Sequence, residues 1–151
     1  MNNYNQHNTL NKNHIINKIN EFLEEDMPNG DITTDSTIHE NISISADIVA
    51  MEPMIFSGEQ IIPECFTSGL ECYKKDGDKL ECNDIIATVK GDAKSILSRE
   101  RVMLNIIQRL CGIATHTRKY VELAKPFNVK ILDTRKTTPG MRLFEKYAVK
   151  C

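Results

Sequence analysis

The chain has 151 residues and a formal net charge of −2, with 40% hydrophobic and 26% charged residues, which is typical of one or two small globular domains. Its apolar runs fall well short of the ~20 residues that span a bilayer, and residues 1–13 lack the apolar core of a signal peptide. We therefore expect no membrane association, and we expect residues 1–13 to form a disordered lead-in.

The two halves of the chain carry opposite charge. Residues 1–93 contain 6 Lys and Arg against 17 Asp and Glu, whereas residues 94–151 contain 13 against 4. The second half is therefore suited to meet anions. Its basic residues do not alternate with aromatic ones, and no helix-turn-helix or RNA-binding signature is present. Small anionic metabolites, or the acidic half of a partner subunit, are the expected partners, and nucleic acid is not.

The five cysteines are odd in number and form no Cys-x-x-Cys pair. They indicate reduced thiols of a cytoplasmic protein, and they argue against a disulfide or zinc framework. The four histidines are scattered without ligand spacing, so no residue of this chain is predicted to bind a metal.

The first ninety residues predict a small α+β layer. Isoleucine or alanine occupies every second position from Ile42 to Ala50, the pattern of a half-buried antiparallel strand. Elsewhere apolar residues recur at helical spacing or form short runs between Pro, Gly and Asp turns. We expect helices over residues 14–25 and 58–67, an extended segment over 32–35, and strands over 42–50, 70–73 and 85–90.

Residues 92–111 predict a long amphipathic helix. Asp92 is a good N-cap, and Gly112 is expected to end this helix before a second one over residues 114–124. Glu100 falls within the apolar face. Because an unpaired buried carboxylate is costly, Glu100 is expected to form a structural salt bridge.

A polar line runs along the edge of the same helix face. It consists of Arg101, Asn105 and Gln108, which are spaced to share one side of a helix. A solvated cation is the simplest interpretation of Arg101. Its place beside an apolar stripe also makes it a candidate for a packed interface or an anion site.

The strongest candidate site is the stretch Asp133-Thr134-Arg135-Lys136-Thr137-Thr138-Pro139-Gly140. It follows a short apolar run at residues 129–132, which predicts a strand, and precedes residues 141–150, which predict a helix. A guanidinium, an ammonium, three hydroxyls and the free N–H groups of a helix start converge there. These donors suit a small, doubly charged anion, although for an isolated Arg-Lys pair an ordinary strand-to-helix turn with solvated cations is the favoured interpretation.

Five segments, found in order along the chain, carry a resemblance to a known family. They are residues 30–34 (Gly-Asp-Ile-Thr-Thr), 45–52, 91–105, 112–115, and 133–140 with 145–149. Together they resemble quinolinate phosphoribosyltransferase, also called nicotinate-nucleotide pyrophosphorylase. The resemblance runs from about residue 19 to the end of the chain, and the last three segments are the most specific.

The resemblance implies an N-terminal α/β-hammerhead domain, expected over residues 14–111 with the long helix, and the start of an open α/β barrel from residue 112. It implies a glycosyltransferase reaction of NAD biosynthesis, in which quinolinate and phosphoribosyl pyrophosphate give nicotinate mononucleotide, pyrophosphate and CO2 with Mg²⁺. Thr134, Arg135 and Lys136 would line the quinolinate site, with Lys136 as the catalytic residue. Arg101 would reach the corresponding site of a neighbouring subunit in a homodimer.

The chain ends within the first βα unit of the implied barrel, while a complete barrel of this type takes about 250 residues. We therefore expect a truncated protein without turnover of its own, an expectation that formation of nicotinate mononucleotide by purified 1–151 would contradict. We also expect the lone strand to lack ladder partners and the apolar face of the last helix to meet water. The alternatives are a paralogue, such as nicotinate phosphoribosyltransferase or a molybdenum-transport-associated relative, and a non-catalytic dimerising fragment.

Overall fold

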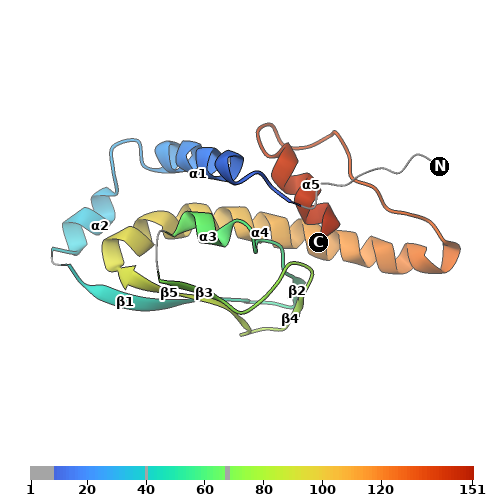
Figure 1. The fold of residues 1–151 in the computed structure, drawn as a ribbon, viewed down its shortest axis with the longest axis horizontal. Coiled ribbons are helices and arrows are strands. Elements are labelled where there is room, and N and C mark those ends of the chain that lie inside the picture. Colours follow the sequence, from blue (N-terminus) through green and yellow to red (C-terminus); the bar gives the residue numbers. More distant parts are fainter. Residues whose placement is uncertain (1–8, 40, 67–68) are drawn as a thin grey trace.

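The structure, a computed structural model, describes residues 9–39, 41–66 and 69–151 and has an α+β fold (Figure 1). Of the helices in these ranges, none is both long and apolar enough to cross a membrane. The elements in chain order are α1 (Lys12–Asp26), α2 (Ile32–Thr37), β1 (Ser43–Val49), β2 (Met54–Ile55), α3 (Ile62–Cys65), β3 (Leu70–Cys72), β4 (Lys79–Leu80), β5 (Ile85–Asp92), α4 (Ala93–Ala124), the 3-10 helix η1 (Lys125–Phe127) and α5 (Arg142–Lys150).

The elements form layers around α4. An antiparallel sheet in the order β1-β5-β3 lies on one side of this helix, and α1 and α5 lie on the other (Figure 1). The register of β1 and β5 pairs Ser43 with Asp92 and shifts at a bulge between Ile48 and Val49. A second pair, β2 and β4, packs on α4 beyond the end of the sheet. The strands predicted over 42–50, 70–73 and 85–90 are thus confirmed.

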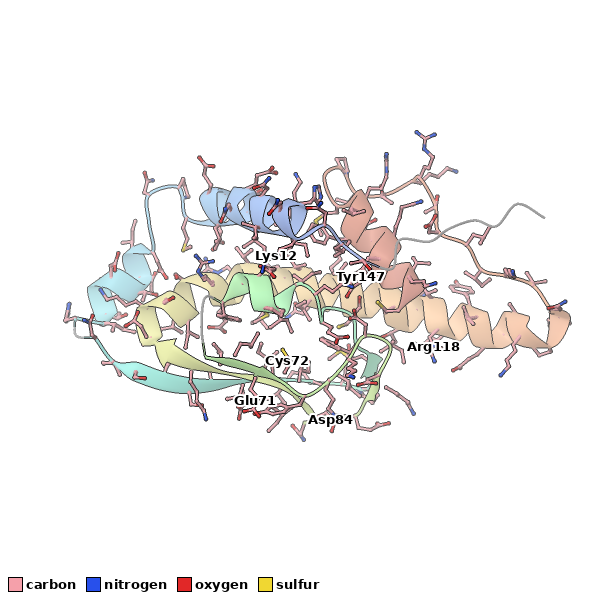
Figure 2. All side chains as sticks on the ribbon, in the orientation of Figure 1. Lys12, Glu71, Cys72, Asp84, Arg118 and Tyr147 are labelled. Atoms are coloured by element: carbon pink, nitrogen blue, oxygen red, sulfur yellow. The ribbon has the colours of Figure 1, made fainter. Side chains whose placement is uncertain are left out.

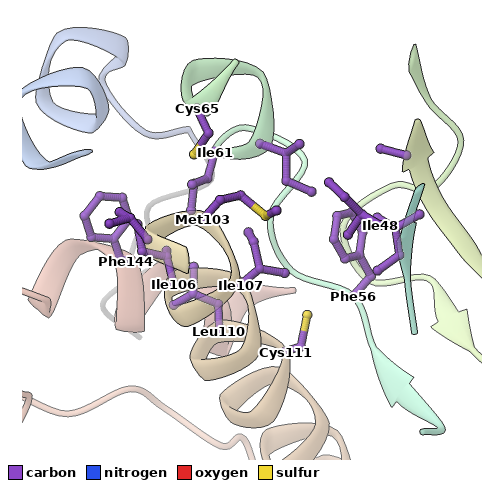
Figure 3. Packing of buried hydrophobic residues seen from close by; sticks show 14 of the residues in the cluster. Ile48, Phe56, Ile61, Cys65, Met103, Ile106, Ile107, Leu110, Cys111 and Phe144 are labelled. Atoms are coloured by element: carbon purple, nitrogen blue, oxygen red, sulfur yellow. The ribbon is translucent and has the colours of Figure 1, made fainter. Parts of the chain in front are cut away.

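A single apolar core surrounds α4 (Figure 3). Met103 and Ile107 face Phe56 and the sheet, while Ile106 lies beside Phe144 of α5. Burying side chains of this size stabilises the fold by roughly 1.5–3 kcal/mol each relative to exposing them. The helix α4 therefore acts as the common support of both the sheet and the C-terminal segment.

Helix α4 does not end at Gly112, and the prediction of two helices was wrong. The helix runs without a break from Ala93 to Ala124. A glycine inside a helix costs about 1 kcal/mol relative to alanine, but Leu110, Cys111 and Ala114 on either side are all buried. Tertiary packing on both sides of the glycine outweighs that local preference.

Residues 32–35 are helical rather than extended, because Asp31 caps the start of α2. The Asp31 carboxylate accepts hydrogen bonds from Thr34 N at 3.0 Å and from Thr34 Oγ1 at 2.5 Å. These bonds, with the side-chain bond the larger cause, lower the pKa of Asp31 below its ordinary value.

Replacing Asp31 by alanine should lower the free energy of unfolding by about 1 kcal/mol at pH 7 through loss of this cap. Because the folded pKa is depressed, the stabilisation is present above the unfolded pKa of about 4 and is lost as pH falls through the folded value. Urea unfolding at pH 7 and pH 3 should therefore show that the difference in free energy of unfolding between Asp31→Ala and the parent becomes smaller at pH 3. Asp35→Ala, which removes an exposed ion pair to Lys94, is the control and should cost less.

The apolar face of α5 is buried, which corrects the expectation that it would meet water. Phe144 and Ala148 are fully buried and Tyr147 is 2% exposed, and α5 packs chiefly on α4. The hydroxyl of Tyr147, a residue labelled in Figure 2, donates a hydrogen bond to Asp76 in the turn before β4. The C-terminal helix is therefore joined to the N-terminal half of the fold.

Order also begins earlier than residue 14. Leu10 is buried and its backbone N–H donates to Gln60 Oε1 at 2.9 Å, and Asn11 caps α1. Residues 1–8 of the predicted lead-in lie outside the described residues.

Residues 129–132 are not a strand, and this prediction was wrong. Val129 is 59% and Leu132 58% exposed, and the described strands all belong to the two sheets formed by β1 to β5. A parallel strand needs a neighbouring strand for its backbone hydrogen bonds. The apolar run has none here, so its β-propensity is not realised.

Candidate anion-binding site

The loop between η1 and α5 presents the three residues predicted to bind an anion. Thr134, Arg135 and Lys136 are consecutive and all exposed. The Lys136 backbone N–H donates to Thr134 Oγ1 at 3.1 Å, and Arg142 donates to the carbonyl oxygen of Arg135 at 3.4 Å. These hydrogen bonds involve the loop backbone and the Thr134 side chain. The Arg135 guanidinium and the Lys136 ammonium therefore place two positive charges at the surface of one short segment.

A tight turn leads from this loop into α5. Gly140 has a positive φ of 80°, a conformation that residues with a side chain rarely adopt. The Met141 N–H donates to the carbonyl oxygen of Thr138 at 3.0 Å, and α5 starts at the next residue. The predicted order of loop followed by helix is confirmed.

The C-terminal end of the loop is bound to a buried carboxylate. Glu145 is only 8% exposed. Its Oε1 accepts from Arg109 Nε at 2.9 Å and Nη2 at 2.5 Å, and its Oε2 accepts from Thr138 N at 3.3 Å. Arg109 Nη2 also donates to Thr138 Oγ1 at 2.5 Å. Burial raises the pKa of Glu145, but the hydrogen bonds from Arg109 and Thr138 outweigh it and the net pKa is lowered, so Glu145 is an anion at neutral pH.

The N-terminal end of the loop is held by a second ion pair. Asp133 Oδ1 lies 2.8 Å from Lys146 Nζ, and the two side chains are 4% and 14% exposed. This is the most buried ion pair in the part of the chain that the structure describes. Sequence reasoning missed both pairs, although Arg109 continues the i, i+4 line that starts at Arg101 and Asn105.

Arg101 lies apart from the loop. Its Nη1 donates to both carboxylate oxygens of Asp26, at 3.1 and 3.0 Å, and its side chain is 66% exposed. The hydrogen bond with Asp26 is the largest cause that raises the pKa of Arg101. Within the described residues, no hydrogen bond or ion pair joins Arg101 to residues 134–136. Both bonds use one nitrogen, so the Nε–Nη2 edge takes no part in the contact with Asp26.

A pocket of about 450 Å³ is lined by residues of α1, α4 and the end of the loop, but by neither Arg101 nor residues 134–136. Its lining includes Asp26, which pairs with Arg101, then Arg109 and Thr138, and also Asn105 and apolar side chains of α1 and α4. Asn105 of the predicted polar line therefore borders the pocket. Gln108 instead lines a larger groove beside the sheet, together with Glu100. Glu100 is exposed rather than buried in the apolar face, so the reason for expecting it to be a buried salt-bridge partner does not hold.

Comparison with known proteins places both halves of the chain in one family. The family model "Quinolinate phosphoribosyl transferase, N-terminal domain" matches residues 31–111, and the model of the C-terminal domain of the same family matches residues 113–151. The chain is 48% identical over 137 residues to a probable carboxylating nicotinate-nucleotide pyrophosphorylase of Bacillus subtilis, covering 87% of this chain and 47% of that protein. It is 41% identical over 133 residues to quinolinate phosphoribosyltransferase [decarboxylating] 2a, mitochondrial, of Nicotiana tabacum, covering 84% and 37%.

Solved structures show the same relationship. The nicotinate-nucleotide pyrophosphorylase of Francisella tularensis superposes with a TM-score of 0.90 at 38% identity, covering 99% of this chain and 54% of that one. The corresponding protein of Ehrlichia chaffeensis gives a TM-score of 0.84 at 36% identity, covering 94% and 53%. The chain thus spans about half the length of the relatives it matches.

The fold, with an N-terminal α+β domain and the beginning of a barrel domain, together with the cationic loop, defines a relative of the phosphoribosyltransferases. The chain belongs to the quinolinate phosphoribosyl transferase family. The resemblance seen in the sequence is confirmed. The roles of Arg101, Thr134, Arg135 and Lys136 stay predictions.

Proposed function

We propose that this chain takes part in the transfer of a phosphoribosyl group to quinolinate, the step of NAD biosynthesis that yields nicotinate mononucleotide. Membership of the family supports the reaction class. The assignment of quinolinate as the substrate rests on the loop, in which Thr134, Arg135 and Lys136 are consecutive and exposed. Quinolinate has two carboxylates on one ring. A guanidinium fork takes one carboxylate with two parallel hydrogen bonds, and an ammonium adds a positive charge nearby.

In the proposed reaction, the pyridine nitrogen forms a bond to C1 of the ribose as the bond from C1 to the pyrophosphate oxygen breaks. The pyrophosphate leaves with the electron pair. The bond between the ring and the adjacent carboxylate then breaks, CO2 departs, and the ring carbon takes a proton. Such a step requires orientation and charge stabilisation rather than a protein nucleophile. Arg135 and Thr134 would orient the dicarboxylate, and Lys136, as the catalytic residue, would stabilise negative charge at the reacting ring.

We also propose a homodimer in which Arg101 reaches the quinolinate site of the neighbouring subunit. Its 66% exposed side chain and the unused Nε–Nη2 edge support such a reach. Light scattering over a range of concentrations tests the dimer. A dimer that binds no quinolinate would favour the non-catalytic alternative.

The proposal includes Mg²⁺ as cofactor and a cytoplasmic location. Over residues 9–39, 41–66 and 69–151, no group of three or more His, Cys, Asp or Glu side chains is placed to hold a metal ion. The five cysteines are free thiols, which supports a reducing compartment.

Quinolinate should bind at least tenfold more tightly than nicotinate, because nicotinate lacks the second carboxylate and a charged hydrogen bond contributes about 1.5–3 kcal/mol. Arg135→Ala should remove most of this preference. Calorimetric or NMR titration with both pyridine acids measures it. Lys130→Ala, which deletes an exposed cation of the same connecting segment, should leave it unchanged. Equal affinity of the parent for both acids would overturn the quinolinate assignment, and tighter binding of nicotinate would favour a nicotinate-specific paralogue.

A further inference from the structure

The loop that carries the proposed site has almost no regular backbone structure to hold it. No helix or strand occurs between η1 and α5, at residues 128–141, all of which the structure describes. A loop without ladder hydrogen bonds keeps a defined conformation only if side chains hold it. The question is therefore which side chains fix residues 134–136 and what these contacts do to the loop charges.

Two adjacent residues of α5 hold the two ends of the loop. Lys146 pairs with Asp133 at 2.8 Å, just before Thr134. Glu145 accepts from the backbone N–H of Thr138, two residues after Lys136, at 3.3 Å. Because Glu145 and Lys146 are consecutive in one helix, they fix the separation of the two loop ends.

The same contacts satisfy the two carboxylates nearest in the sequence to residues 134–136. Asp133 and Glu145 are 2 and 9 residues from Arg135 and Lys136, respectively, and both are nearly buried. Each already has its own cation, Lys146 for the first and Arg109 for the second. A carboxylate without such a partner would attract the nearest mobile cation, since the attraction between opposite charges at 4 Å reaches about 4 kcal/mol near a protein surface.

We propose, on the basis of the proposed function, that Lys146 is a positioning residue for the loop at residues 134–136 and that Glu145 and Arg109 act together with it. It holds the loop end and neutralises Asp133, so that Arg135 and Lys136 stay available to the substrate carboxylates. Lys146 does not touch the substrate. It acts through the Asp133 carboxylate, and removing the charge of that carboxylate should therefore remove the need for the positive charge of Lys146.

The test is a double-mutant cycle on the 151-residue chain with quinolinate as the probe. Lys146→Met removes the cation that lies 2.8 Å from Asp133 and should weaken quinolinate binding at least tenfold. The double variant Asp133→Asn with Lys146→Met removes the carboxylate charge as well but does not restore the hold on the loop end, so it should recover only part of the affinity lost in Lys146→Met. Lys146→Arg, which keeps the charge, should stay within about threefold of the parent. The control Lys150→Met removes an exposed cation from the same helix and should change affinity less than twofold.

Hydrogen exchange of residues 133–138 gives a readout that needs no ligand. Lys146→Met should raise exchange there and leave α1 unchanged, so the positioning role is decided even if quinolinate proves not to be the ligand. A double variant that binds as weakly as Lys146→Met would show a merely structural role and overturn the neutralisation proposed here. Unchanged binding and exchange in a folded Lys146→Met would overturn the whole proposal, and if Lys146→Met fails to fold, the double variant and Lys146→Arg decide it.

Discussion

Replacing Phe144 by alanine is expected to lower the free energy of unfolding by about 3–5 kcal/mol, the usual cost of removing a fully buried aromatic ring. Phe144 has no exposed surface, its ring centroid lies 6.0 Å from that of His14, and it packs beside Ile106 (Figure 3). It therefore touches α1 and α4 from α5. Deleting the ring leaves a cavity where three helices meet. A loss of about 3–5 kcal/mol is a large share of the free energy of unfolding of a typical folded domain, which is about 5–15 kcal/mol.

The chain offers a matched control for this variant. Phe127, in η1, is 77% exposed, so Phe127→Ala should change stability by no more than about 0.5 kcal/mol. Urea unfolding followed by circular dichroism measures both. Equal losses for the two variants would contradict the packing of α5 on α4 described above. Because Glu145 and Lys146 lie on the same helix, Phe144→Ala should also weaken the hold of α5 on residues 133–138.

The sequence predicted the parts of the fold in which local pattern and tertiary packing agree. The alternation from Ile42 to Ala50 became β1, and the periodic residues of 141–150 became α5. The family resemblance depended on residue identities in segments that lie in or beside α2, β1, α4 and α5, and not on where each element begins or ends. It was therefore confirmed even though several local details were wrong.

The errors arose where a local signal competed with a non-local one. Gly112 is a common helix terminator, but burial of its neighbours carries α4 past it. Residues 129–132 have the composition of a strand but no neighbouring strand. The sequence could not show that Phe144 and Tyr147 would be covered by α1, α4 and the turn at Asp76, because those contacts join residues far apart in the chain.

The candidate site was predicted in the same uneven way. Thr134, Arg135 and Lys136 are contiguous, so the sequence alone placed them together. The pairing of Arg101 with Asp26 joins residues 75 positions apart, and that of Arg109 with Glu145 joins residues 36 apart. Charge complementarity between distant segments has no periodic signature in a single sequence, so only the structure could show it.

Replacing Asp76 by alanine is expected to destabilise the fold by about 3–5 kcal/mol, because this carboxylate accepts three hydrogen bonds. Its Oδ1 accepts from Gly58 N at 2.7 Å and Glu59 N at 3.0 Å, and its Oδ2 accepts from the Tyr147 hydroxyl. The first and the last of these donors lie in buried residues. Each buried donor left without a partner costs about 1–3 kcal/mol.

Two further variants separate the contributions. Tyr147→Phe removes one bond of the three and should cost about 1–2 kcal/mol. Asp78→Ala, in the same turn, removes a single exposed bond to Lys75 N at 2.8 Å and should cost less than about 1 kcal/mol. The order of the three losses in urea unfolding is the test. If Asp76→Ala lowers the free energy of unfolding by no more than Asp78→Ala does, Asp76 does not link residues 58–59 to α5.

Tyrosine titration provides an independent check of the same link. Burial, followed by the hydrogen bond to Asp76 and its negative charge, raises the pKa of Tyr147 well above the ordinary range. In Asp76→Ala the contributions of the carboxylate disappear while the burial stays, so the absorbance titration of this tyrosine should move to lower pH without reaching the position of an exposed tyrosine.

Tyr147 follows Lys146 directly, so hydrogen exchange at residues 133–138 should rise in Asp76→Ala and not in Asp78→Ala. That pattern would show that the N-terminal domain stabilises the loop at residues 133–138 through α5. Unchanged exchange in both variants would show that Glu145 and Lys146 hold the loop independently of that domain.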